Sequence, residues 1–310
     1  MGHSWPFSHY FPVGTYYHDV DSFRRAAELD SRGQTMIVVT GATGNVGRPL
    51  VRALAEAGEH VTAVSRRISA LDVPAGVRHR QADLADPASL PSAFDGAEVL
   101  FLLTSGDFVS AGGRVSDVLD ATRAAGIRRV VLLSSQGVAT GSHPSTLEDP
   151  IVQSDLAWTM LRPGGFHSNT FGWAEMVRSQ RMVAAPFGDV ALPTIDPSDI
   201  AEVAAAVLRD TAHVGRAYVL TGPAPISPRQ QASAIADALG EPVRFVEQSR
   251  AEARAQMLRF MPEPVVENTL TILGTPKIGE QQVSPHVERI LGRPARTFAA
   301  WAVRNTSAFK

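Results

Sequence analysis

Three closely spaced glycines give the clearest chemical signal in this chain of 310 residues. Gly41, Gly44 and Gly47 stand in the run GATGNVG, directly after the apolar run 36–40 and before a segment rich in alanine and leucine. The first permits a tight turn, the second lets the backbone approach a pyrophosphate, and the third lets a helix pack closely on a strand. The N–H groups of residues 44–46 would then point at the phosphates, assisted by the helix dipole. We predict a dinucleotide site formed by Gly41, Thr43, Gly44, Asn45, Val46 and Gly47.

The end of the next apolar run selects the dinucleotide. An NAD site carries Asp or Glu about 20 residues beyond the glycines, where the carboxylate accepts from the ribose 2′-hydroxyl. This sequence has Ser65, Arg66 and Arg67 there instead. A hydroxyl and a guanidinium fork suit a 2′-phosphate, so we predict NADP(H). The alternative is that both arginines are solvated surface residues.

The counts of tyrosine and lysine limit the proton chemistry. The chain has four tyrosines and two lysines, Lys277 and Lys310. Hydride-transferring enzymes often use Tyr-x-x-x-Lys, in which the lysine lowers the pKa of the tyrosine that exchanges a proton with the substrate. We expect neither lysine near the fifth strand, and residues 137–158 contain no tyrosine. Hydride transfer without that acid favours quinones and conjugated carbonyl compounds, because their reduced anions are delocalised.

Polar residues that follow the predicted fifth and sixth strands are the candidates for contact with the reacting atoms. Ser135 is the predicted catalytic donor or oxyanion stabiliser, and Ser134 is expected to line the cofactor. The alternative is that both serines only cap a strand end. No histidine pair has metal-ligand spacing, so we predict no metal site. A lone histidine such as the one at 167 is more often incidental, but the predicted substrate contacts are His143, Phe166, His167, Asn169 and Trp173.

These candidates need elements that bring them together. Strands are predicted at 36–40, 61–65, 77–79, 99–103, 130–134 and 159–161, and helices between them at 45–57, 88–94 and 110–125. This alternation predicts βαβ units and an α/β fold with a doubly wound parallel sheet, the Rossmann fold. Open sheets of this kind bind ligands at the carboxyl ends of their strands, where the candidate residues stand.

The chain divides into three predicted parts. Residues 1–35 form an irregular, aromatic-rich N-terminal arm, residues 36–165 the NADP-binding Rossmann core, and residues 166–310 a smaller, mostly helical substrate lobe with some segments returning to the sheet. The arm is either a loose surface extension, a mis-set translation start, or a cover for a partner subunit or the active site. Helices are expected in the lobe at 169–179, 198–209, 228–239, 251–260, 265–272 and 296–305.

The composition excludes several classes of protein. Hydrophobic residues make up 44% and charged residues 19%, a globular balance. The net charge of −2 offers no positive field to a phosphate backbone, so nucleic acid is not an expected partner. The absence of cysteine excludes disulfides, thiolate catalysis and cysteine-ligated metals. With no run of 18 apolar residues and no secretory signal, we expect no membrane span and a cytoplasmic location.

Several motifs together resemble the NmrA-like family of atypical short-chain dehydrogenase/reductases. They are GATGNVG at 41–47, the pair Asp83 and Leu84, LRPGGF at 161–166 and DPSDIA at 196–201, and the resemblance spans residues 36–309. It implies that Asp83 and Leu84 border the adenine, that Thr104 passes the nicotinamide-side ribose, and that the turn after Pro163 closes over the nicotinamide. Read without the resemblance, Asp83 equally fits a loop-to-helix cap.

The motifs and the resemblance together leave more than one function open. We predict an NADPH-dependent oxidoreductase that acts on a quinone-like or conjugated carbonyl small molecule. The regulator that names the family implies an alternative, a non-catalytic NADP(H) sensor that binds a regulatory protein partner. A third hypothesis is a non-redox isomerase or cyclase on the same scaffold, since a fold does not fix a function. For assembly, the alternative to a regulatory protein partner is a homodimer.

Overall fold

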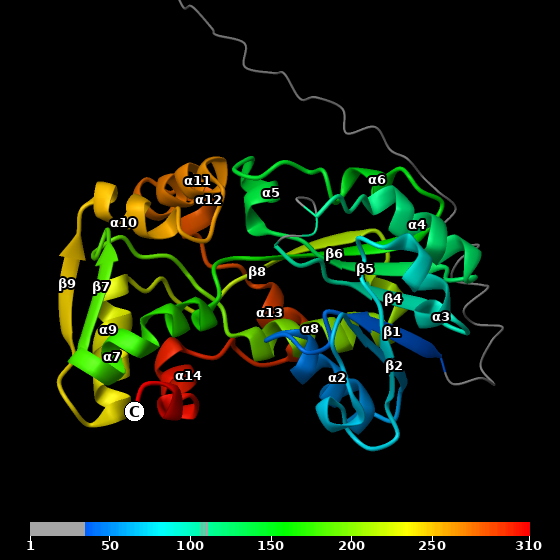
Figure 1. Ribbon diagram of the computed structural model, residues 1–310, viewed down its shortest axis with the longest axis horizontal. Coiled ribbons are helices and arrows are strands. Elements are labelled where there is room, and N and C mark those ends of the chain that lie inside the picture. The colour runs from blue at the N-terminus through cyan, green and yellow to red at the C-terminus, as the bar shows by residue number, and fades with distance from the viewer. Residues whose placement is uncertain (1–34, 107, 109–110) are drawn as a thin grey trace, which may run out of the picture. The chain divides into compact units, whose positions relative to one another are not determined.

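The computed structural model describes residues 35–106, 108 and 111–310. Among them, seven strands form one parallel sheet in the order β3-β2-β1-β4-β5-β6-β8 (Figure 1). The order reverses between β1 and β4, which is the doubly wound arrangement predicted from the sequence. The strands are β1 (Met36–Thr40), β2 (His60–Ser65), β3 (Arg78–Gln81), β4 (Val99–Leu102), β5 (Arg129–Leu133), β6 (Ala157–Pro163) and β8 (Arg216–Leu220).

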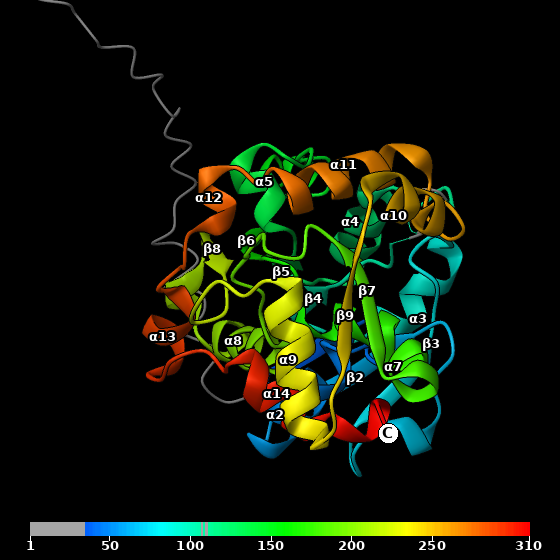
Figure 2. The same cartoon turned by 90° about the vertical axis from the view of Figure 1, so that its left-hand side faces the viewer.

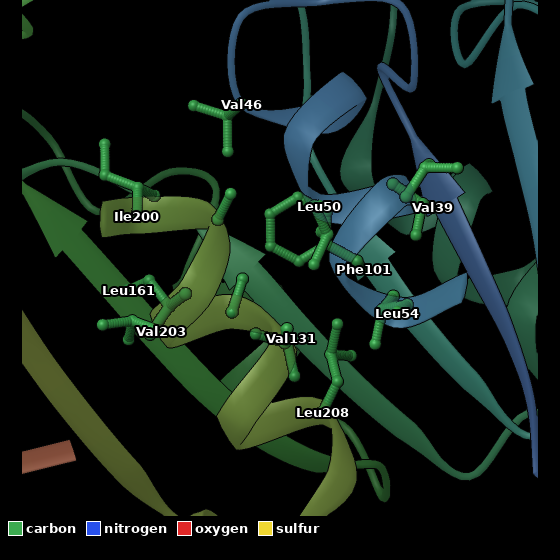
Figure 3. Packing of buried hydrophobic residues seen from close by; sticks show 14 of the residues in the cluster. Val39, Val46, Leu50, Leu54, Phe101, Val131, Leu161, Ile200, Val203 and Leu208 are labelled. Carbon is green, nitrogen blue, oxygen red and sulfur yellow. The ribbon is translucent and has the colours of Figure 1, made fainter. Parts of the chain in front are cut away.

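Both faces of the central strands β1, β4 and β5 are buried, which explains their continuous apolar runs. In β1, Val39 contributes to the core on one face and Val38 to the core on the other. The parallel register sets Val39 beside Phe101 and Val38 beside Leu100 of β4, so each face continues across the sheet. Figure 3 shows Val39 and Phe101 among the side chains of one core cluster. Burial on both sides is typical of parallel sheets.

Helices cover the two faces and complete the α/β fold class, which is confirmed. One face packs against α2 (Gly47–Glu56), α8 (Pro197–Arg209) and α13 (His286–Leu291). The other packs against α3 (Leu90–Phe94), α4 (Val115–Ala124) and α6 (Asp149–Val152). Because α8 and β8 belong to this arrangement, part of the region after residue 166 returns to the main sheet.

The rest of the region after residue 166 builds its own small core. Two strands, β7 (Met182–Pro186) and β9 (Arg244–Gln248), pair in parallel as a separate sheet, and the sequence analysis predicted neither. The aromatic rings of Phe298, Trp301 and Phe309 are buried in this core. The helices of this region are α7 (Ala174–Gln180), α9 (Pro228–Leu239), α10 (Arg250–Met257), α11 (Glu263–Gly274), α12 (Ile278–Gln281) and α14 (Phe298–Arg304).

Ion pairs hold the C-terminal region against α8. Asp196 caps the helix by accepting from the Ser198 N–H at 2.9 Å, and its carboxylate also pairs with Arg304. Asp199, which is fully buried, accepts from Arg293 at 2.8 Å and also pairs with Arg296. Breaking such a pair would leave a buried charge without compensation, so these contacts fix where the C-terminal segment lies.

The predicted N-terminal arm lies outside the described residues except for residue 35. Within the described ranges, no helix is both long enough and apolar enough to cross a membrane.

Candidate active site

The glycine turn, residues 41–47, has the geometry that a cofactor pyrophosphate requires. Gly41 has φ of +63°, a left-handed conformation that glycine adopts without strain. A Cβ on Gly47 would lie 2.2 Å from the Gly41 carbonyl oxygen, so only glycine lets α2 approach the turn this closely. A Cβ on Gly44 would meet a single atom within 4 Å, the same oxygen at 3.2 Å, which leaves an open face for a ligand. The turn therefore fits the pyrophosphate that the sequence predicts.

One detail of the predicted phosphate contacts is wrong. The Gly44 N–H donates to the Gly41 carbonyl at 3.0 Å and closes the turn, so it does not point outward. The amides of Asn45 and Val46 stay the predicted phosphate donors. Val46 is the N-cap of α2 with no side-chain cap, and the first turn of α2 has no acidic residue, so nothing in that turn opposes an anion.

The end of β2 gathers hydroxyl and guanidinium groups beside the glycine turn. The Thr43 and Ser65 hydroxyls are hydrogen-bonded at 2.9 Å, which ties the turn to the strand end. Arg66 and Arg67 follow and are exposed, and the register sets Arg80 of β3 beside Val64. These residues fit a 2′-phosphate, for which guanidinium forks are well suited.

A cavity of about 520 Å³ opens at the carboxyl ends of β4 and β5, next to the glycine turn. It brings together seven of the predicted residues, which are Asn45, Val46, Thr104, Ser134, Ser135, His143 and Phe166. Apolar side chains supply much of the remaining wall, which consists of Leu103, Ser105, Gly106, Phe108, Leu133, Val138, Pro144, Thr146, Leu147 and Glu148. Such a mixture of apolar walls and few polar groups is typical of a small-molecule site.

Ser135 and His143 form a hydrogen-bonded pair in the cavity wall. Ser135 is the N-cap of α5 (Gln136–Thr140), and its Oγ accepts from the Gly137 N–H at 3.1 Å. The same Oγ lies 2.8 Å from His143 Nδ1. The imidazole rests on Gly137, where a Cβ would lie 2.5 Å from the ring. Burial lowers the pKa of His143, and the negative charge of Glu280 opposes that shift.

A buried carboxylate that sequence reasoning missed completes the wall. Glu148 accepts from the Ser134 hydroxyl at 2.5 Å and from both ends of the Arg162 guanidinium fork, at 2.9 and 2.5 Å. This bidentate pair joins the end of the loop after α5 to β6. The signal available in the sequence was Arg162 in the LRPGGF motif, but nothing local identifies its partner.

His167 does not line this cavity, which corrects its assignment as a substrate contact. Its side chain is buried, its Nε2 lies 2.8 Å from the Thr194 carbonyl oxygen, and its ring packs edge-on against Phe298 and Trp301. Burial lowers the pKa of His167 to about 4. We therefore assign His167 to packing. Trp173 likewise packs against the core of the lobe instead of lining the cavity.

Asn169, Asp83, Leu84 and Pro163 do not line the cavity. Asn169 is exposed on the turn after Phe166. Asp83 Oδ1 accepts from the Ala85 N–H at 3.0 Å within the loop after β3, but the following helical turn is capped by Asp86, so the loop-to-helix cap alternative for Asp83 is wrong. Leu84 packs against the core. Pro163 is buried at the end of β6. Contacts of Asp83, Leu84 and Pro163 with a cofactor stay predictions.

Lys277 approaches the helix that follows β5, a contact that the sequence analysis did not predict. Lys277 Nζ donates to the Thr140 carbonyl oxygen at 2.8 Å, at the end of the short helix that follows β5. The two residues are 137 positions apart, so only the folded chain brings them together.

Comparison with known proteins decides the family. Residues 41–211 match the NAD(P)H-binding family, and a (4-alkanoyl-5-oxo-2,5-dihydrofuran-3-yl)methyl phosphate reductase of Streptomyces griseus is 37% identical over 283 residues, 88% of this chain and 99% of its own. This chain belongs to the NAD(P)H-binding family. The predicted resemblance to NmrA-like reductases is confirmed, and the chain is an NAD(P)H-dependent oxidoreductase.

Two solved structures are similar to this reductase along most of its chain. The NADPH-dependent quinone oxidoreductase of Escherichia coli, in complex with NADPH, has a TM-score of 0.74 and 25% identity, with 87% of this chain and 99% of that chain covered. The negative transcriptional regulator NmrA, in complex with NADP, has a TM-score of 0.68 and 21% identity, with 89% and 96% covered. The second likeness shows the fold alone.

Proposed function

We propose that this reductase uses NADPH to reduce a small molecule whose double bond is conjugated with a carbonyl, such as a quinone or an unsaturated lactone. The observation that carries the proposal is which polar side chains line the cavity. Its described lining offers Ser135 paired with His143 and contains neither tyrosine nor lysine. An acceptor that forms a delocalised anion needs less help from a strong acid than a plain ketone does.

Ser135 is the proposed donor to that anion. Its Oγ already accepts from the Gly137 N–H. When His143 Nδ1 carries a proton, it donates to the same oxygen, and the Ser135 O–H is left to face the cavity. The Ser135 proton then passes to the reduced acceptor, and His143 replaces it with its own.

The proposed cofactor contacts follow from the cradle described above. The amides of Asn45 and Val46 hold the pyrophosphate, and Ser65, Arg66 and Arg67 hold the 2′-phosphate. NADPH supplies the hydride when it is bound. The apolar wall beside the glycine turn, with Leu103 and Phe166, excludes water from the reacting atoms.

The relatives support the same class of substrate. In the ring named for the Streptomyces griseus relative, the double bond is conjugated with a ring carbonyl and carries an alkanoyl group on the adjacent carbon. Hydride addition to such a ring leaves an anion spread over two carbonyl groups. The quinone named for the Escherichia coli relative also gives a delocalised anion.

A substrate panel tests the proposal. NADPH oxidation is measured with quinones, unsaturated lactones and plain ketones, and we expect turnover of the first two groups only. Ser135→Ala should lower turnover by about tenfold or more without changing NADPH affinity. Ser249→Ala removes an equivalent N-cap serine from α10 and is the matched control. Preference for plain ketones would refute the proposed class, and NADPH binding without any turnover would favour the sensor alternative.

A further inference from the structure

A segment distant in sequence is bound to the helix that carries the Ser135–His143 pair. We call residues 276–284, which contain α12, the C-terminal strap. Figure 1 and Figure 2 both show α12 beside α5. Gln136 Nε2 donates to the Gly279 carbonyl at 3.0 Å at the first turn of α5. At the other end of α5, Lys277 Nζ donates to the Thr140 carbonyl at 2.8 Å. The strap therefore holds α5 at both ends.

Glu280 is the centre of these contacts. Its Oε1 accepts from the Thr140 hydroxyl at 3.0 Å, and its Oε2 accepts from the Lys277 N–H at 2.8 Å. The side chain is buried, only 4% of the residue being exposed. Burying a carboxylate costs free energy unless an opposite charge or hydrogen bonds compensate it. The two partners of Glu280 are a neutral hydroxyl and a backbone amide.

We propose that Glu280 is a positioning residue for the reaction: it fixes α5 so that Ser135 and His143 keep their hydrogen bond, and it sets a buried negative charge within electrostatic reach of the imidazole. This inference rests on the proposed function, in which His143 resupplies Ser135 with a proton. It assigns the strap a part in proton delivery, although no strap residue lines the cavity.

The negative charge of Glu280 changes the pKa of His143 in one direction. Burial of the imidazole lowers the pKa of His143, and Glu280 acts against that shift, so it favours the protonated ring. The other charged groups that the structure describes around this pair include Lys277 on the strap, Glu148 at the far end of the His143 loop, and Arg162, which pairs with Glu148. Because Lys277, Glu148 and Arg162 are unchanged when only Glu280 is replaced, a shift in the His143 titration reports the Glu280 charge.

The central experiment compares Glu280→Gln with Glu252→Gln. Glu252 accepts from its N-cap backbone N–H on α10 as Glu280 does on α12, so the control makes the same change from carboxylate to amide in a capping side chain on an exposed helix. With a naphthoquinone as acceptor, Glu280→Gln should lower kcat at neutral pH by about fivefold or more. The alkaline fall of kcat should move to lower pH by about half a unit, with KM for NADPH unchanged. Equal pH profiles in the two variants would overturn the proposal.

A double variant separates electrostatic positioning from general loosening of the fold. His143→Gln removes the group on which Glu280 is proposed to act. In that background Glu280→Gln should change kcat by less than about twofold, because coupled residues are not additive. A loss as large as in the wild-type background would show a purely structural role and overturn the inference. If Glu280→Gln does not fold, Thr140→Val keeps the charge and must lower kcat while leaving the pH midpoint in place, and a moved midpoint counts against the proposal.

Nuclear magnetic resonance keeps this inference separate from the proposed function. The imidazole signals of His143, assigned by their loss in His143→Gln, are titrated in the wild type and in Glu280→Gln. The midpoint should be lower in the variant by about half a pH unit, whether or not any acceptor is reduced. A lower midpoint without turnover on the substrate panel would reject the proposed function alone, and an unchanged midpoint would reject the role of Glu280.

Discussion

Replacing two glycines of the same turn by alanine should separate folding from cofactor binding. In Gly47→Ala the new Cβ would lie 2.2 Å from the Gly41 carbonyl oxygen and 2.8 Å from the Ala42 Cα. Both are backbone atoms of the turn, so α2 must move away from β1. Overpacking of this kind costs about 1 to 3 kcal/mol, and the better helix propensity of alanine recovers up to about 1 kcal/mol. We expect a net loss of stability and a lower melting temperature by roughly 2 to 8 °C.

Gly44→Ala should keep the stability of the wild type and lose NADPH affinity. Its Cβ meets one protein atom at 3.2 Å, a contact that a shift of a few tenths of an ångström relieves. The methyl group would instead occupy the open face at which the pyrophosphate is expected. The melting temperature should stay within about 2 °C of the wild type, and NADPH affinity should fall by tenfold or more, which is about 1.4 kcal/mol.

Thermal unfolding without cofactor and fluorescence titration with NADPH measure the two effects on the same samples. The reasoning requires that the larger loss of stability belong to Gly47→Ala and that the affinity loss in Gly44→Ala occur in a protein of normal stability. Retained NADPH affinity in Gly44→Ala would refute the assignment of its open face to the cofactor. An equal melting temperature in the two variants would refute the steric argument.

Two further changes test the cofactor preference and the buried histidine. Arg66→Ala should weaken NADPH binding by about 1.5 to 3 kcal/mol and leave NADH binding nearly unchanged, and equal affinities of the wild type for both cofactors would contradict this. Because His167 has its pKa lowered by burial from 6.5 to about 4, the unfolded chain binds its proton first, and stability should fall by about 3 kcal/mol as pH drops from 6.5 to 4. His167→Phe keeps a ring against Phe298 and Trp301 and should flatten that part of the profile of unfolding free energy, measured by denaturant titration at each pH. An unchanged slope would show that other groups cause it.

The main sheet was predictable because its signals are local. The strands β1, β4 and β5 are buried on both faces, so each contains an uninterrupted apolar run. The strands β7 and β9 escaped prediction for the reverse reason. In β9, RFVEQ has no fully buried residue and no alternation of apolar and polar side chains, and neither the run nor its flanks distinguish it from a loop. Its place is fixed by pairing with β7, which lies about 60 residues earlier in the chain.

Local sequence likewise predicted some features of the candidate site and missed others. Ser135 and His143 are eight residues apart, and both were predicted near the cavity because they follow one strand end. Their hydrogen bond was not predicted, since it depends on the one-turn helix α5 and on the space above Gly137. His167 was misplaced because a residue after a strand can face the ligand or the core, and the aromatic cluster that receives its ring comes from α14.

The sequence by itself determined the cofactor class and the α/β fold. A glycine turn, a buried strand and the start of a helix are encoded by neighbouring residues whose backbone preferences act over a few positions. The tertiary structure alone decided which charges surround the reacting groups. Thr140 and Glu280 are 140 residues apart, and Glu148 pairs with Arg162 because β6 carries the guanidinium to the end of the loop after α5. Such pairs depend on the approach of separate elements, and a side chain's type does not specify its distant partner.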